Sequence, residues 1–128
     1  MKALRVAGFG LVVVVVLFLL GITQGCSKKG NLVLDNSSFD SAPAELKEKW
    51  KAAGEYVARK NYLGAATNLI DLFSKKQQLS TEQNDALNQA WMKLGNEAFA
   101  AANNGDKAAT EAVLKMRETG IGERRSQQ

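Results

Sequence analysis

The stretch Ser80–Asp106, STEQNDALNQAWMKLGNEAFAAANNGD, decides the fold that this chain can adopt. Its apolar residues recur at spacings of three and four, the period of one face of an α-helix. That face consists of Leu87, Ala90, Trp91, Leu94 and Ala98, with Phe99 beside it. Ser80 and Gln83 have the spacing of a capping box at a helix N-terminus. Because Asn103-Asn104-Gly105 is a typical helix stop, we predict one long helix between Ser80 and Gly105.

The same period predicts three further helices. A segment that begins at Pro43 and ends at Lys60-Asn61 carries the stripe Leu46, Trp50, Ala53 and Val57. The next segment carries Tyr62, Ala65, Ala66, Leu69, Ile70, Leu72 and Phe73. The last segment, capped by Asp106 and ended by Gly120, carries Ala109, Ala112, Val113 and Met116. We therefore predict an all-α fold, with residues 42–120 as a helical domain and residues 121–128 as a frayed polar tail.

Two of the predicted helices share a motif. Trp50 is followed four residues later by Gly54, and Trp91 is followed in the same way by Gly95. With Leu94, the second copy resembles the tetratricopeptide repeat, whose pattern begins Trp-x₂-Leu-Gly. The resemblance implies two consecutive αα-hairpins. Two unrelated amphipathic hairpins closed as a small four-helix bundle fit the same pattern, and this alternative stays open.

The N-terminus has the pattern of an export signal. Lys2 and Arg5 precede residues 6–22, which carry no charge and are dominated by the apolar run Leu11–Leu20. The early cations favour a cytoplasmic start, so the remainder of the chain is expected on the far side of the membrane. The chain's one cysteine, Cys26, follows shortly after the apolar run.

Thr23-Gln24-Gly25-Cys26 resembles the lipobox of bacterial lipoproteins, in which a small residue directly precedes the modified cysteine. The resemblance implies cleavage between Gly25 and Cys26, a diacylglycerol thioether on Cys26, and acylation of the new amino group by a palmitate-type chain. The sequence departs from the family pattern at Thr23 and Gln24. The resemblance also implies that Ser27, after the lipidated cysteine, would permit sorting to the outer membrane of a two-membrane bacterium. Residues 1–25 are then the signal peptide and residues 26–41 a tether. The one apolar patch in that tether, Leu32-Val33-Leu34, could form a short strand-like segment or dock on the domain.

The same leader also fits an uncleaved anchor. Seventeen uncharged residues are just long enough to span a bilayer as a helix. In that alternative, residues 6–22 hold the chain in the membrane, and the protein is a structural accessory subunit of an envelope complex. Both interpretations give an exported, membrane-anchored protein on the periplasmic side of a bacterial envelope.

The amino-acid composition excludes several kinds of catalytic and metal-binding site. The chain has no histidine and one cysteine, which removes imidazole bases, His-ligated metals and any Cys-only zinc site. Glu55, Asp71 and Glu97 are the acids nearest the apolar stripes, and we interpret them as solvated or capping groups. Between Asp40 and Leu114 there are 9 Lys and Arg against 10 Asp and Glu, which does not favour nucleic-acid binding. We therefore expect no enzyme activity, no cofactor and no metal.

Aromatic residues are the remaining candidates for a binding role. Six of them could pack in the core or line a groove between the hairpins, where helical repeats bind peptides: Trp50, Tyr56, Tyr62, Phe73, Trp91 and Phe99. We expect Tyr56 and Tyr62 to show an edge at the surface and to contact a partner. The sequence thus predicts a membrane-tethered lipoprotein whose helical domain binds or scaffolds an unidentified protein.

Overall fold

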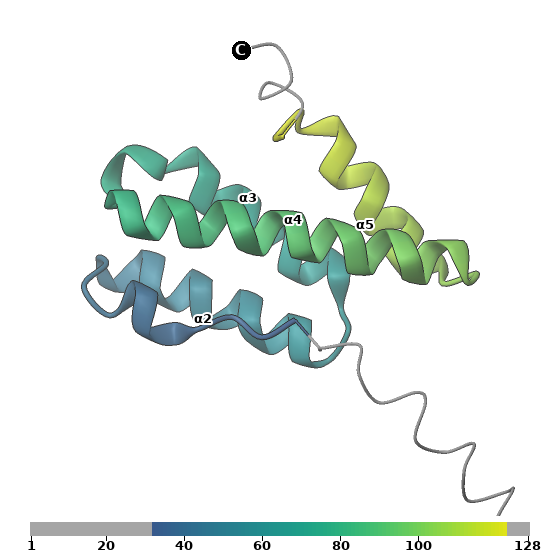
Figure 1. Ribbon diagram of the computed structural model, residues 1–128, viewed down its shortest axis with the longest axis horizontal. Helices are drawn as coiled ribbons and strands as arrows, with labels where there is room; N and C mark the ends of the chain where they lie inside the picture. The colour runs from purple at the N-terminus through teal and green to yellow at the C-terminus, as the bar shows by residue number, and fades with distance from the viewer. Residues whose placement is uncertain (1–31, 123–128) are drawn as a thin grey trace, which may run out of the picture. The chain divides into compact units, whose positions relative to one another are not determined.

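The computed structural model describes residues 32–122, which form four α-helices and two short 3₁₀ turns, with no strand in that range (Figure 1). The elements are η2 (Asn36–Phe39), α2 (Ala44–Ala58), α3 (Tyr62–Ser74), η3 (Lys76–Gln78), α4 (Thr81–Asn103) and α5 (Lys107–Glu118). The prediction of an all-α fold is confirmed for this part of the chain. The predictions for residues 1–25, for Cys26 and for residues 123–128 lie outside the described residues.

Local hydrogen bonds explain where the helices begin. The Ser80 hydroxyl accepts a bond from the Gln83 backbone N–H at 3.1 Å, and the Gln83 side chain accepts one from the Ser80 N–H at 3.0 Å. This is the predicted capping box. Asp106 accepts from the Ala109 N–H at 3.1 Å to start α5. Between these two helices Gly105 has a φ of +92°, a left-handed conformation that favours glycine.

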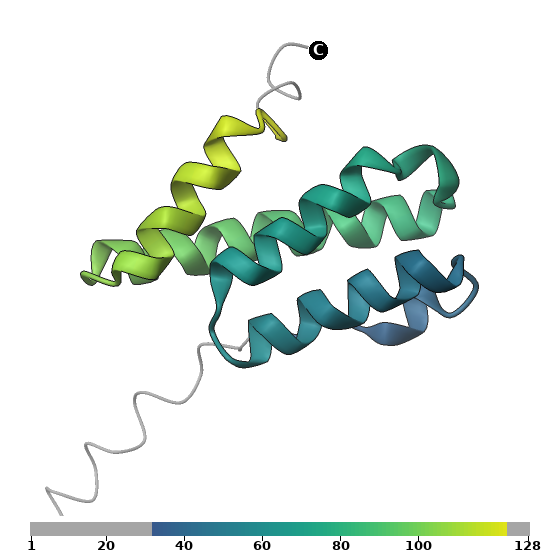
Figure 2. The ribbon, with the colours of Figure 1, turned by 180° about the vertical axis from the view of Figure 1, so that it is seen from behind.

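The apolar stripes form one continuous core. Every residue predicted for the α2 stripe and every residue of the α4 stripe is buried, each being 6% exposed or less. Helix α3 contacts α2, α4 and α5, while α4 also packs against α5 (Figures 1 and 2). The core therefore surrounds α3, whose small Ala65 and Ala66 let the neighbouring helices approach closely.

Residues 32–39 also belong to this core. Leu32, Leu34 and Phe39 are buried, whereas Val33 between the first two is 79% exposed. The Phe39 ring stacks on Trp50 with centroids 4.2 Å apart, and the Trp50 indole N–H donates to the Asp35 carbonyl at 3.0 Å. The sequence assigned residues 26–41 to a tether, but the compact unit begins at Leu32. The part from Leu32 onward is docked because its apolar side chains meet α2.

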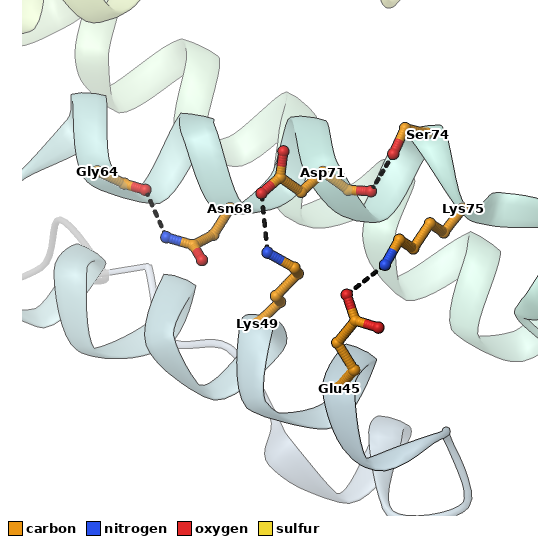
Figure 3. A network of polar contacts seen from close by, with 7 residues as sticks. All are labelled: Glu45, Lys49, Gly64, Asn68, Asp71, Ser74 and Lys75. Atoms are coloured by element: carbon orange, nitrogen blue, oxygen red, sulfur yellow. Dashed lines mark hydrogen bonds and ion pairs between the residues drawn. The ribbon is translucent and has the colours of Figure 1, made fainter.

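Two ion pairs join α2 to α3 along their exposed edge (Figure 3). Lys49 donates to Asp71 at 2.9 Å, and Lys75 donates to Glu45. Asp71, one of the acids considered as a candidate catalytic group, therefore has a structural partner. The hydrogen bond from Lys75, together with its charge, lowers the pKa of Glu45. The hydrogen bond to Asp71, together with its charge, raises the pKa of Lys49.

These shifts predict how stability depends on pH. Because folding lowers the pKa of Glu45, its stabilisation is present above the ordinary value of 4.5 and is lost as the pH falls through the lowered pKa. Lys49 has the opposite sign: its stabilisation is present below 10.5 and is lost as the pH rises further. We expect Glu45→Gln to reduce the acid-side loss of stability, measured by urea denaturation between about pH 5 and pH 2. Glu48→Gln on the same helix is the control, and equal acid profiles for the two variants would contradict the assignment.

Glycine plays different roles at two positions. A Cβ at Gly64, in the first turn of α3, would lie 2.6 Å from a ring carbon of Tyr56, so the Tyr56 ring packs directly on the glycine. A Cβ at Gly54 would meet Leu34 at 3.7 Å, which is an ordinary contact. The tight approach therefore occurs at Gly64, outside the repeated tryptophan–glycine motif.

Alanine substitution should change the stability of the domain in opposite directions at these two glycines. We expect Gly64→Ala to destabilise the domain by about 1–3 kcal/mol, because the new methyl group displaces the Tyr56 ring. Gly54→Ala should instead stabilise it by about 0.5–1 kcal/mol, since a helix interior favours alanine over glycine. Urea denaturation of both variants measures the difference. A change of the same sign for both would show that Tyr56 does not depend on the bare backbone at Gly64.

Candidate functional site

Helix α4 presents two large apolar side chains to solvent. Met92 is 60% exposed and Phe99 is 50% exposed. They lie seven residues apart, which places them on the same side of the helix. Leu114 on α5 is also 53% exposed. Single exposed apolar residues are ordinary on protein surfaces, so the surroundings of Met92 and Phe99 decide whether they form a site.

The first hollow beside Met92 has a volume of about 880 Å³. It lies where the end of α3, η3, the first half of α4 and the turn after α5 meet. Its apolar lining is Phe73, Trp91, Met92 and Ile121. Its polar lining is Lys76, Gln77, Asn84 and Asn88, with Gly120 and Gly122 at the turn. A mostly apolar hollow with a few polar groups is the usual composition of a binding pocket.

The second hollow, about 310 Å³, lies between α4 and α5. It is lined by Trp91, Gly95, Asn96 and Phe99 from α4, by Val113, Met116 and Arg117 from α5, and by residues 120–122. Bare Gly95 helps to open this space, because a Cβ there would reach the Met116 methyl group at 3.5 Å. Trp91 and residues 120–122 line both hollows, so they form the common boundary between them.

The position of Trp91 is fixed from two sides. Its ring meets Phe73 edge-on, with centroids 5.4 Å apart. Its indole N–H donates to the Ile121 carbonyl at 3.0 Å. The chain turns back to reach it through Gly120, whose φ of +59° favours glycine. Ile121, which the sequence assigned to a frayed tail, is half-buried against the core and bonded to Trp91. We call Trp91, Met92, Phe99 and Ile121 the α4 strip.

The two tyrosines proposed from the sequence lie elsewhere. Tyr62 is 7% exposed, so a partner could touch only a small part of it. Burial, with smaller contributions from the charges of Glu97 and Asp106, raises the pKa of Tyr62. Tyr56 is half-buried, with its ring packed on Gly64. Neither tyrosine lines the two hollows, and the expectation of an exposed edge on Tyr62 was wrong.

Three of the six aromatics considered from the sequence do line the hollows: Phe73, Trp91 and Phe99. Trp50 is instead buried against Phe39. Sequence reasoning missed Met92 and Ile121. The spacing of Met92 and Phe99 beside the buried stripe was a signal for the first, but the return of Ile121 to Trp91 is a long-range contact with no local signature.

The structure places two further features considered from the sequence, metal-ligating groups and the acid Glu97. Residues 32–122 contain no group of three or more His, Cys, Asp or Glu side chains able to hold a metal ion. Glu97, another of the acids considered, accepts a hydrogen bond from the Leu32 backbone N–H at 2.8 Å. No helix within this range has the length and apolar character needed to cross a membrane. The apolar lining around the α4 strip can bind an apolar group of a ligand. The polar side chains beside it can form hydrogen bonds that orient the ligand.

Comparison of the chain with models of protein families, with curated protein sequences and with solved structures gave no match.

Proposed function

We propose that this protein is an exported bacterial lipoprotein whose helical domain binds or scaffolds another protein at the membrane surface. The tether is supported by the sequence: a basic start, an apolar run and Gly25-Cys26. Diacylglycerol and an added acyl chain on Cys26 would give stable anchoring, since one chain alone binds a bilayer only weakly. The domain then lies on the periplasmic side, with the outer membrane as one destination permitted by Ser27.

The binding role rests on the α4 strip. Exposed Met92 and Phe99 border two neighbouring hollows, and such contiguous apolar surface is typical of sites that contact a partner. We further propose that the four helices are a pair of tetratricopeptide-like hairpins. The packing of α2 on α3 and of α4 on α5 supports this arrangement. Repeat helices of this kind use the grooves between them for extended or helical segments of other proteins.

Photocrosslinking in intact bacterial cells tests the binding role. A photoreactive amino acid is placed at position 92 or 99 in the full chain, and at position 114 as a control of similar exposure outside both hollows. We expect the same discrete adduct from positions 92 and 99 and none from position 114. Equal labelling at all three positions, or no adduct at any of them, would contradict a partner-binding surface on α4.

A further inference from the structure

We propose that the α4 strip binds an acidic amphipathic segment of its partner, with two apolar side chains in the hollows and carboxylates near Lys76 and Arg117. This inference rests on the proposed function and names the chemistry of the partner. It follows from the spacing of the two hollows and from the charges that line them.

The spacing of the hollows sets the length of the segment. The α4 residues that line the first hollow run from Asn84 to Met92, with Asn88 midway, and those that line the second run from Trp91 to Phe99, with Gly95 midway. At 1.5 Å per residue these midpoints lie about 10 Å apart along the helix axis. Apolar side chains seven residues apart in a helix, or three apart in an extended chain, cover about the same distance. A segment of roughly ten residues can therefore reach both hollows across their common boundary at Trp91 and Ile121.

The charged residues that line the hollows indicate the sign of the charge that the bound segment carries. Among the described residues that line the hollows, the charged side chains are Lys76 in the first and Arg117 in the second. Both are exposed, and neither forms an ion pair within residues 32–122, in contrast to Lys75, which pairs with Glu45. Cations that have no ion-pair partner among residues 32–122 and lie beside apolar hollows favour a ligand that brings carboxylates, because such pairs make charge-assisted hydrogen bonds.

Other occupants fit these observations less well. In a symmetric contact between two copies of the chain, the same strip would face itself, and the Lys76 and Arg117 side chains would gather in one interface. A bilayer presents a broad surface, whereas the two hollows are separate concave spaces of about 880 and 310 Å³. A peptide segment satisfies both the shape and the charge.

Selection from a peptide library tests the inference. The full chain is placed in phosphatidylcholine nanodiscs and panned against phage-displayed random 16-residue peptides, with empty nanodiscs as the background. We expect the enriched peptides to combine spaced apolar residues with Asp or Glu. A synthetic peptide of the enriched sequence is then titrated by fluorescence anisotropy against variants of the full chain.

Matched variants test whether the peptide binds at the α4 strip. Met92→Glu should weaken binding at least about tenfold, because it puts a carboxylate beneath the bound apolar side chain. Leu114→Glu, of similar exposure and equal charge change, should alter binding less than about twofold. Lys76→Glu should weaken binding roughly three- to tenfold, and exchanging the peptide's acids for Lys should restore it. Lys93→Glu, an exposed lysine of α4 outside both hollows, is its control.

Several results would overturn the inference. They are enriched peptides without acidic residues, equal binding by the Met92→Glu and Leu114→Glu variants, or no enrichment above empty nanodiscs. Binding of the chain to phosphatidylglycerol vesicles that Met92→Glu abolishes would assign the strip to lipid instead. If crosslinking at position 92 succeeds while the library gives neutral or basic peptides, the acidic partner is wrong and the protein-binding function stands.

Discussion

Replacing Phe39 by alanine is expected to destabilise the domain by about 3–5 kcal/mol, a large part of the total stability of a domain of this size. Phe39 is fully buried, and its ring stacks on Trp50. The substitution removes the stacked ring and leaves a cavity between η2 and α2 that neighbouring side chains fill only in part. Urea or guanidinium denaturation of the full chain, followed by the circular dichroism of the helices, measures the loss.

Val33→Ala is the matched control for this prediction. Val33 lies in the same segment but is 79% exposed, so its loss should change the free energy of unfolding by no more than about 0.5 kcal/mol. The contrast tests whether residues 32–39 are part of the core. Similar small effects for both variants would mean that the segment is a free tether that does not dock on the domain.

Cys26→Ser is expected to abolish lipid attachment. The lipobox resemblance makes the Cys26 thiol the only group in the chain that can receive the diacylglycerol thioether, since no other cysteine is present. Radiolabelled palmitate should enter the wild-type chain in growing bacteria and be absent from the variant. Because the resemblance places cleavage after lipid transfer, the Cys26→Ser variant should accumulate as uncut precursor that retains residues 1–25.

Lys28→Ala is the control for this substitution, because it changes a neighbouring residue and leaves the thiol in place. It should incorporate palmitate as the wild type does. If the Cys26→Ser variant still partitions with membranes at its full-length mass, and palmitate never labels the wild type, the uncleaved anchor formed by residues 6–22 is the correct interpretation.

The helices could be predicted because their signals are local. A 3.6-residue period marks the buried face, and capping residues act within one turn, so Ser80, Gln83 and Asp106 could be assigned from their neighbours alone. The docking of Leu32 was one of two alternatives that the sequence left open, and the docking of Phe39 could not be predicted in this way. Their segment has no sustained period, and its burial depends on Trp50 in α2 and on Glu97 in α4, which lie far away in the sequence.

The candidate site was predicted in part. Phe73, Trp91 and Phe99 were among the aromatics considered for a groove, but the same pattern fits a core, and helical spacing alone does not separate the two. Tyr62 was misplaced because its position at the start of α3 brings it against the core in the folded domain. Ile121 belongs to the strip through a turn built on Gly120, and only the folded chain reveals where that turn leads.

The intact mass of the native protein, extracted from bacterial membranes, decides whether the domain is tethered by lipid. We expect a chain that begins at Cys26 and carries the added mass of a diacylglycerol and a further acyl group. A chain that retains residues 1–25 with an unmodified thiol would contradict it.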